Sequence, residues 1–144
     1  MTDGQFLGAQ HLKWTERRVS RKGDATRILI VDDYTVGAEA LAAALSSDGY
    51  ETRFAFSGMQ ALQEIGVWIP HIIVLDINMP EHDGFATARV FRGIGELEKA
   101  AIIAFTALSA INVIDKARRA GFDAYCQKGA TLERLQVLID GFVI

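Results

Sequence analysis

Four short apolar segments of this chain each end in polar residues, and this pattern limits the folds that the chain can adopt. Two aspartates follow residues 28–31, a third follows residues 72–75, a threonine follows residues 102–105, and residues 124–126 lead through a glutamine to a lysine. Fully apolar segments of this length, separated by helix-like segments, are typical of buried strands in a parallel sheet. Ligand sites in such sheets lie beyond the carboxyl ends of the strands. We therefore expect Asp32, Asp33, Asp76, Thr106 and Lys128 to meet in one crevice, where they suit a divalent cation and a phosphoryl group.

Composition favours one globular domain. The chain has 144 residues, half of them hydrophobic and only two of them proline, which is enough for a sizeable core. No apolar stretch reaches the roughly 18 residues of a membrane helix, and the N-terminus lacks a secretory signal, so we expect a cytoplasmic chain without membrane contact. The single cysteine, Cys126, lies in a predicted strand and is expected to pack there.

From residue 27 onward the sequence alternates strands and helices. A further strand is expected at residues 51–55, and helices at residues 36–47, 59–65, 84–93, 111–120 and 132–142. Val36, Leu41 and Leu45 are expected on one helical face that packs on the sheet. Gly49 is expected in the left-handed position after that helix, and Ser57 as the next N-cap. This order predicts a doubly wound α/β fold with a five-stranded parallel sheet and helices on both faces.

These motifs, in this order, resemble the receiver domain of bacterial response regulators, the flavodoxin-like acceptor domain of two-component signalling. The resemblance covers residues 27–144, and residues 120–125 also look like the family's usual approach to its fifth strand. An acidic pair or a single threonine is a weak signal, whereas all four elements in order are a strong one. The motifs are Asp32-Asp33, Asp76-Ile77-Asn78-Met79-Pro80 with Asp83-Gly84, Thr106-Ala107, and Tyr125 three residues before Lys128.

The resemblance implies phosphorylation of one aspartate. Asp76 would accept a phosphoryl group from a histidine kinase or phosphotransfer protein, a reaction that needs mostly positioning and charge neutralisation. Mg²⁺ would be held directly by Asp33, Asp76 and the backbone carbonyl of Asn78, and by Asp32 through a water molecule. The backbones of Asn78 and Ala107 would contact the phosphoryl group. Without a cation, the three crowded carboxylates would repel one another.

The resemblance also implies a switch. Lys128 would pair with Asp76 and then with the phosphoryl oxygens, and Thr106 would donate its hydroxyl to the phosphoryl group. Thr106 and Tyr125 would move together and change the face made by the fourth helix, fifth strand and fifth helix. On this interpretation the domain is a signalling acceptor and not an enzyme, with catalysis limited to its own phosphorylation and dephosphorylation.

Charged residues on the last two helices are compatible with a homodimer through that face. Mixed charges can be self-complementary across a two-fold axis, although a solvated, charge-balanced surface is the alternative. The mildly acidic body gives no support for nucleic-acid binding by the core. The charged residues are Asp115, Lys116, Arg118, Arg119, Glu133 and Arg134.

Each site residue also has an ordinary structural interpretation. Alone, Asp33 can be a helix cap, Thr106 a strand-end hydroxyl, Tyr125 edge packing and Lys128 a surface lysine. Their joint spacing favours the receiver site. Two other classes stay open: a degenerate receiver that binds partners independently of phosphorylation, and a haloacid-dehalogenase-type phosphatase. The phosphatase family needs a second acid two residues after the nucleophile, where this chain has Asn78.

Two residues depart from the family pattern. Gly129 follows Lys128 where the family usually has a proline in a cis peptide, and because a cis bond before a non-proline residue costs roughly 2.5–4 kcal/mol, we expect a trans bond here. His82 stands where a hydrophobic residue is common, so it is either a mild pH sensor for its loop or a plain exposed side chain.

Residues 1–26 form an extension before the domain at residues 27–144. The extension carries five basic and three acidic residues and has no clean helical period. We expect a flexible arm. The alternatives are a segment that docks on this domain or on its dimer mate, and a nucleic-acid contact. Trp14 is poorly accommodated in a free tail unless something covers it. Because the chain ends with its last predicted helix, we expect either a receiver that acts through partner proteins or part of a longer regulator.

Overall fold

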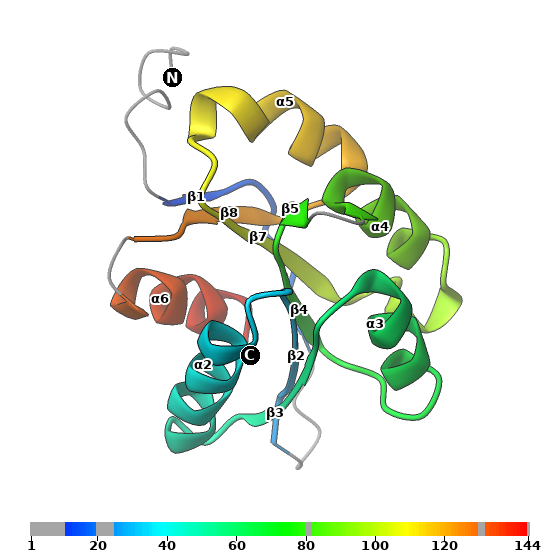
Figure 1. The fold of residues 1–144 in the computed structure, drawn as a ribbon, viewed down its shortest axis with the longest axis vertical. Coiled ribbons are helices and arrows are strands. Elements are labelled where there is room, and N and C mark those ends of the chain that lie inside the picture. The colour runs from blue at the N-terminus through cyan, green and yellow to red at the C-terminus, as the bar shows by residue number, and fades with distance from the viewer. Residues whose placement is uncertain (1–10, 20–24, 80–81, 130–131, 144) are drawn as a thin grey trace.

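A six-stranded sheet forms the centre of the computed structural model, which describes residues 11–19, 25–79, 82–129 and 132–143 (Figure 1). The strand order is β1-β8-β7-β4-β2-β3, and every pairing is parallel except that of β1 with β8. The bounds are β1 His11–Lys13, β2 Arg27–Val31, β3 Glu51–Ala55, β4 Ile72–Leu75, β7 Ala101–Thr106 and β8 Ala124–Gln127. The doubly wound α/β fold is confirmed, with one strand more than the predicted five.

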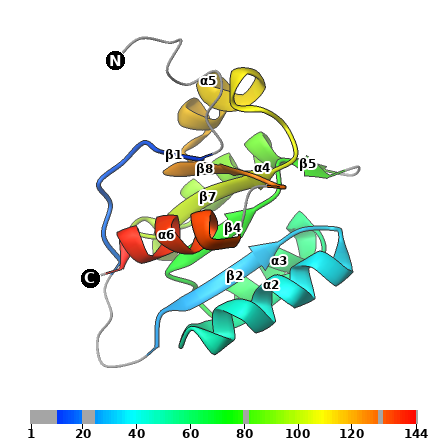
Figure 2. The same cartoon turned by 90° about the vertical axis from the view of Figure 1, so that its left-hand side faces the viewer.

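Helices cover both faces of the sheet (Figures 1 and 2). Helices α2 and α6 pack on one face, and α3, α4 and α5 pack on the other. Successive strand residues point to opposite faces, so Leu29 and Val31 join one core and Ile28 and Ile30 the other. The helices are α2 Thr35–Ser47, α3 Gly58–Ile65, α4 Gly84–Arg92, α5 Ala110–Ala120 and α6 Leu132–Phe142. None of the helices in the described part is long and apolar enough to cross a membrane.

Local signals predicted most boundaries to within one or two residues. Ser57 caps α3 by accepting a hydrogen bond from the Gln60 backbone N–H at 3.1 Å, and Gly49 has a φ of +93° after α2, both as predicted. Val36 was placed wrongly: its side chain is 66% exposed. The buried face of α2 instead consists of Ala38, Leu41, Ala42 and Leu45.

Three very short elements escaped prediction because two or three residues are too few to reveal a hydrophobic period. Strands β5 (Asn78–Met79) and β6 (His82–Asp83) pair as an antiparallel ladder after β4, and a 3₁₀ turn, η1, covers Gly95–Leu97. Asp83 caps α4 through the Phe85 N–H. Gly84 lies so close to the preceding turn that a Cβ would stand 2.4 Å from the Ile77 Cα, so this contact requires a glycine.

The described part of the N-terminal extension docks on the domain, which is the alternative that the sequence left open beside a flexible arm. Strand β1 adds to the free edge of β8, with His11 opposite Cys126 and Lys13 opposite Ala124. Val19 is buried and bridges to Val143. Backbone groups of an edge strand are open to such pairing, and the extension supplies apolar side chains that cover the edge. Residues 1–10 and 20–24 of the extension lie outside the described residues.

Candidate functional site

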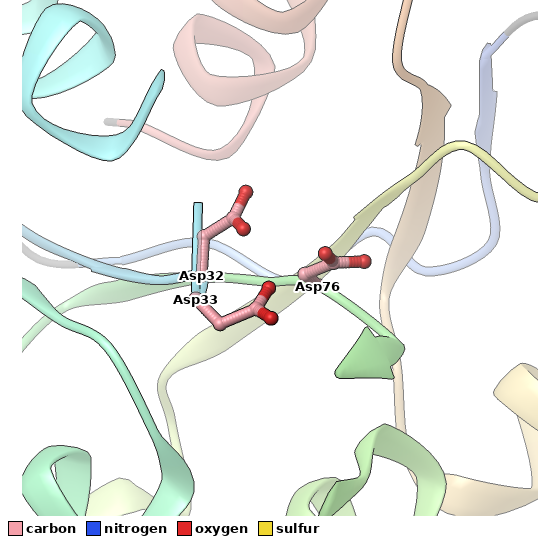
Figure 3. Close-up of side chains that lie close together, drawn as sticks. All are labelled: Asp32, Asp33 and Asp76. Atoms are coloured by element: carbon pink, nitrogen blue, oxygen red, sulfur yellow. The ribbon is translucent and has the colours of Figure 1, made fainter. Parts of the chain in front are cut away.

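Three carboxylates lie side by side at the carboxyl ends of two neighbouring strands (Figure 3). Asp32 and Asp33 follow β2, and Asp76 follows β4. Because β2 and β4 are parallel, with Val31 opposite Leu75, the residues that follow them come together. One oxygen from each acid lies within 4.8 Å of the others. Asp32 and Asp76 are buried, whereas Asp33 is exposed.

One ammonium group bridges two of these acids. Lys128 Nζ lies 2.6 Å from Asp32 Oδ2 and 3.0 Å from Asp76 Oδ2. Burial raises the pKa of Asp76, although the charge and hydrogen bond of Lys128 oppose this. Burial alone would lower the pKa of Lys128, but its hydrogen bonds and charge interactions with Asp32 and Asp76 outweigh burial and raise it. The acids retain excess negative charge, and their hard oxygen atoms fit a divalent cation such as Mg²⁺.

Backbone N–H groups orient the two buried acids. Asp76 Oδ1 accepts from the Asn78 N–H at 3.1 Å, and Asp32 Oδ1 accepts from the Tyr34 N–H at 3.0 Å. Asp33 is not a helix cap, because α2 begins after Tyr34 and has no side-chain cap. The remaining carboxylate oxygens are therefore available to a ligand or to Lys128.

Thr106 lies at the end of β7, fully buried, with the exposed Ala107 after it. Its Oγ1 accepts from the Leu108 N–H at 3.3 Å, and its carbonyl accepts from the Lys128 N–H at 2.8 Å. The second bond holds the Lys128 segment against β7. The Lys128–Gly129 peptide is trans, as predicted, and Gly129 has a φ of +92°.

Tyr125 points inward and connects to Thr106 through one residue. Its side chain is fully buried, and its hydroxyl donates to the Leu108 carbonyl at 2.8 Å. Burial raises the pKa of Tyr125 to about 12. Leu108 thus contacts both predicted switch residues, and the sequence offered no signal that singled it out. The predicted pH sensor, His82, has a side chain outside the described part.

Asp123 is a buried acceptor whose role the sequence did not predict. It accepts from Thr15 Oγ1 at 2.7 Å, Arg17 Nε at 2.9 Å, Arg92 at 2.5 Å and the Ile102 N–H at 2.8 Å. Burial lowers the pKa of Arg92, and the Asp123 charge partly offsets this. An acidic residue just before the last strand was the only available signal, and its partners come from distant segments. The group joins the N-terminal extension, α4 and the sheet.

Comparison with known proteins identifies the family. The family model of the response regulator receiver domain matches residues 28–140, so the chain belongs to this family. The response regulator MprA of Mycobacterium tuberculosis is 36% identical over 111 residues, which cover 77% of this chain and 47% of MprA. The chain therefore spans about half the length of the curated relatives it matches. It is a receiver domain of two-component signalling, and receiver domains of such systems interact with histidine kinases or phosphotransfer proteins.

Solved structures give the same fold. The chemotaxis protein CheY4 of Vibrio cholerae superposes with a TM-score of 0.78 at 22% identity, covering 82% of this chain and 98% of CheY4, a likeness of fold alone. A response regulator of Burkholderia pseudomallei, solved with a phosphorylated aspartic acid, calcium ion and citrate, is 26% identical with a TM-score of 0.72. That match covers 78% of this chain and 65% of the other. Family membership favours neither the phosphatase nor the phosphorylation-independent module.

Proposed function

We propose that this domain accepts a phosphoryl group on Asp76 from a histidine kinase or phosphotransfer protein, with Mg²⁺ as cofactor. The observation that carries this proposal is the cluster of three carboxylates within 4.8 Å of one another, two of which Lys128 bridges. The Burkholderia relative, with its phosphorylated aspartic acid and calcium ion, supports the same use of the site.

The metal would be held by Asp33, Asp76 and the backbone carbonyl of Asn78, and by Asp32 through water. When bound, Mg²⁺ neutralises negative charge on the acceptor and on the phosphoryl oxygens. The acid cluster supports this assignment because a single ammonium group cannot balance three carboxylates.

Transfer would proceed by an in-line displacement at phosphorus. A carboxylate oxygen of Asp76 bonds to phosphorus while the phosphorus–nitrogen bond of the donor phosphohistidine breaks. The electron pair stays on the imidazole nitrogen, which takes a proton from solvent. The Asn78 N–H orients Asp76 for this attack from 3.1 Å. Catalysis by the domain is limited to its own phosphorylation and dephosphorylation.

Lys128 and Thr106 would then hold the transferred group. Lys128 Nζ needs only to exchange Asp76 Oδ2 for a phosphoryl oxygen, because its 2.6 Å contact with Asp32 keeps it in place. Thr106 Oγ1 accepts from Leu108, so its hydroxyl hydrogen can still be donated to the phosphoryl group. The backbone N–H groups of Asn78 and Ala107 would also donate to the phosphoryl oxygens.

The donor protein would approach through a cleft of about 330 Å³ beside the acids. Asp32 and Lys128 are the charged residues that line this cleft, and Tyr34, Phe105 and Leu132 are among its apolar lining residues. Tyr34 is 62% exposed and Leu132 is 40% exposed, so a partner can cover them. A second partner is another copy of this chain, through the face of α5, β8 and α6. We place both interactions in the cytoplasm, without nucleic-acid contact by the core.

Phosphorylation is tested by incubating the protein with acetyl phosphate and Mg²⁺ and measuring its intact mass. We expect one phosphate adduct that is lost in Asp76→Asn and retained in Asp115→Asn, a control on the exposed side of α5. An adduct on the Asp76→Asn protein would show that the acceptor is a different residue. Turnover of free phosphomonoesters would instead support a phosphatase.

A further inference from the structure

The described N-terminal residues lie across the edge of the sheet, where they cover the face predicted for output (Figures 1 and 2). We call residues 11–19 the strap. Its strand β1 pairs with β8, and the Trp14 and Thr15 N–H groups donate to the Asp123 carbonyl at 2.7 and 3.3 Å. The Val19 N–H donates to the Phe142 carbonyl at 2.8 Å, so the strap also reaches the end of α6.

Side chains anchor the strap at two places. At the sheet edge, Trp14 stacks on Tyr125 with 6.5 Å between ring centroids and 24° between planes, and Arg17 pairs with the buried Asp123. At the end of α6, two cations of the strap reach one carbonyl: Lys13 Nζ and Arg18 donate to Gly141 at 3.2 and 2.9 Å. Cations are favourable at a helix C-terminus.

We propose that the strap is an intramolecular occupant of the face formed by α5, β8 and α6, and that it leaves this face when Thr106 engages a phosphoryl group. The release step rests on the proposed phosphorylation of Asp76. While the strap is docked, the backbone groups at the edge of β8 are paired, so a second copy of the chain cannot use that edge.

A short series of contacts connects the strap to the phosphorylation site. Trp14 stacks on Tyr125, the Tyr125 hydroxyl donates to the Leu108 carbonyl at 2.8 Å, and the Leu108 N–H donates to Thr106 Oγ1 at 3.3 Å. When Thr106 turns toward a phosphoryl group, the Leu108 segment moves with it. Tyr125 then loses its acceptor and its ring shifts under Trp14. The strap loses one of its two anchors at the sheet edge.

One buried polar group of the strap destabilises the docked state and so favours release. Trp14 Nε1 is buried without a hydrogen-bond partner among the described residues. An unsatisfied buried donor is unfavourable, and exposure to water on release would satisfy it. Trp14 therefore stabilises the docked strap through its ring stack and destabilises it through its buried N–H. Because these two contributions oppose each other, a small shift of the Tyr125 ring can change whether the strap is docked or released.

Amide hydrogen exchange on the full chain tests the release directly. In the free protein we expect the Trp14, Thr15 and Val19 amides to be protected. With Mg²⁺ and beryllofluoride, a phosphoryl mimic, we expect this protection to fall while that of β2 stays unchanged. The acetyl phosphate adduct is measured on the same preparation. If the adduct forms and the strap keeps its protection, the release is refuted while the proposed function stands; if no adduct forms, both fail.

Thermodynamic reciprocity supplies a second test. If activation releases the strap, weakening the strap must favour activation by the same factor. We expect Arg17→Ala to raise the affinity for beryllofluoride in saturating Mg²⁺ by up to about 5-fold, measured by calorimetry. Glu16→Gln is the matched control on the same strap. The Glu16 side chain is 90% exposed and, among the described residues, makes only a solvent-exposed 3.7 Å ion pair with Lys13, so the affinity of this variant should match that of the unmodified protein. Equal affinity in Arg17→Ala and Glu16→Gln refutes the coupling.

Discussion

Truncation of Asp123 to alanine should be among the most destabilising single changes in this domain. The Asp123 side chain is 1% exposed and accepts from two arginines, one hydroxyl and one backbone N–H. Alanine removes all four acceptor contacts. Arg92, whose side chain is only 18% exposed, then keeps a largely buried positive charge with backbone carbonyl acceptors but without its carboxylate.

The expected loss of stability is set by the Arg92 charge that no longer has a carboxylate partner. Breaking a buried ion pair by removing one partner typically costs about 3–5 kcal/mol, so we expect the free energy of unfolding to fall by about 4 kcal/mol. Arg17→Ala is the internal comparison. Its side chain is 30% exposed and Asp123 retains Arg92, so we expect a loss of only about 1 kcal/mol.

Urea unfolding followed by circular dichroism measures both losses. With an m-value of about 2 kcal/mol/M, the Asp123→Ala midpoint should fall by about 2 M and the Arg17→Ala midpoint by about 0.5 M. Asp123→Asn, which keeps the size and one acceptor oxygen, should lie between them. A loss below about 1 kcal/mol for Asp123→Ala, with an unchanged m-value, would refute the view that this carboxylate holds the segments together.

Two further outcomes follow from the same structure. Calorimetry should show weak saturable Mg²⁺ binding that is lost in Asp33→Ala. The same change should slightly stabilise the metal-free fold, because it removes one of three crowded charges. An Asp33→Ala protein with the same Mg²⁺ affinity as Asp115→Ala would contradict a shared acidic site. Stability should also decline above about pH 9, because burial raises the pKa of Cys126 from 9.0 to about 11 and that of Tyr125 from 10.0 to about 12. The unfolded chain then loses these protons first, so the free energy of unfolding falls as pH rises. The free energy of unfolding should fall less steeply with pH in Tyr125→Phe than in the unmodified protein. Equal slopes in the two proteins would contradict the contribution of Tyr125.

Strand and helix positions were predictable because their signals are local. The apolar runs before Asp32, Asp76 and Thr106 reveal buried strands from composition alone, and parallel strands necessarily deliver their final residues to the same edge. The meeting of Lys128 with Asp32 and Asp76 was therefore predictable from strand order. Val36 was misplaced because several registers of an alanine-rich helix bury similar amounts of apolar surface.

Only the tertiary structure decided that residues 11–13 pair with the outer edge of β8. Nothing within residues 11–19 distinguishes a docked strand from a flexible arm, because the residues that hold them lie more than a hundred positions away in the sequence. Trp14 stacks on Tyr125, and Arg17 pairs with Asp123. The same is true of Leu108, which links Tyr125 to Thr106 only once the loop after β7 lies against β8. The sequence determined the acidic site, because neighbouring strand ends define it. Contacts between distant segments determined the strap, because their energy exists only after the chain has folded.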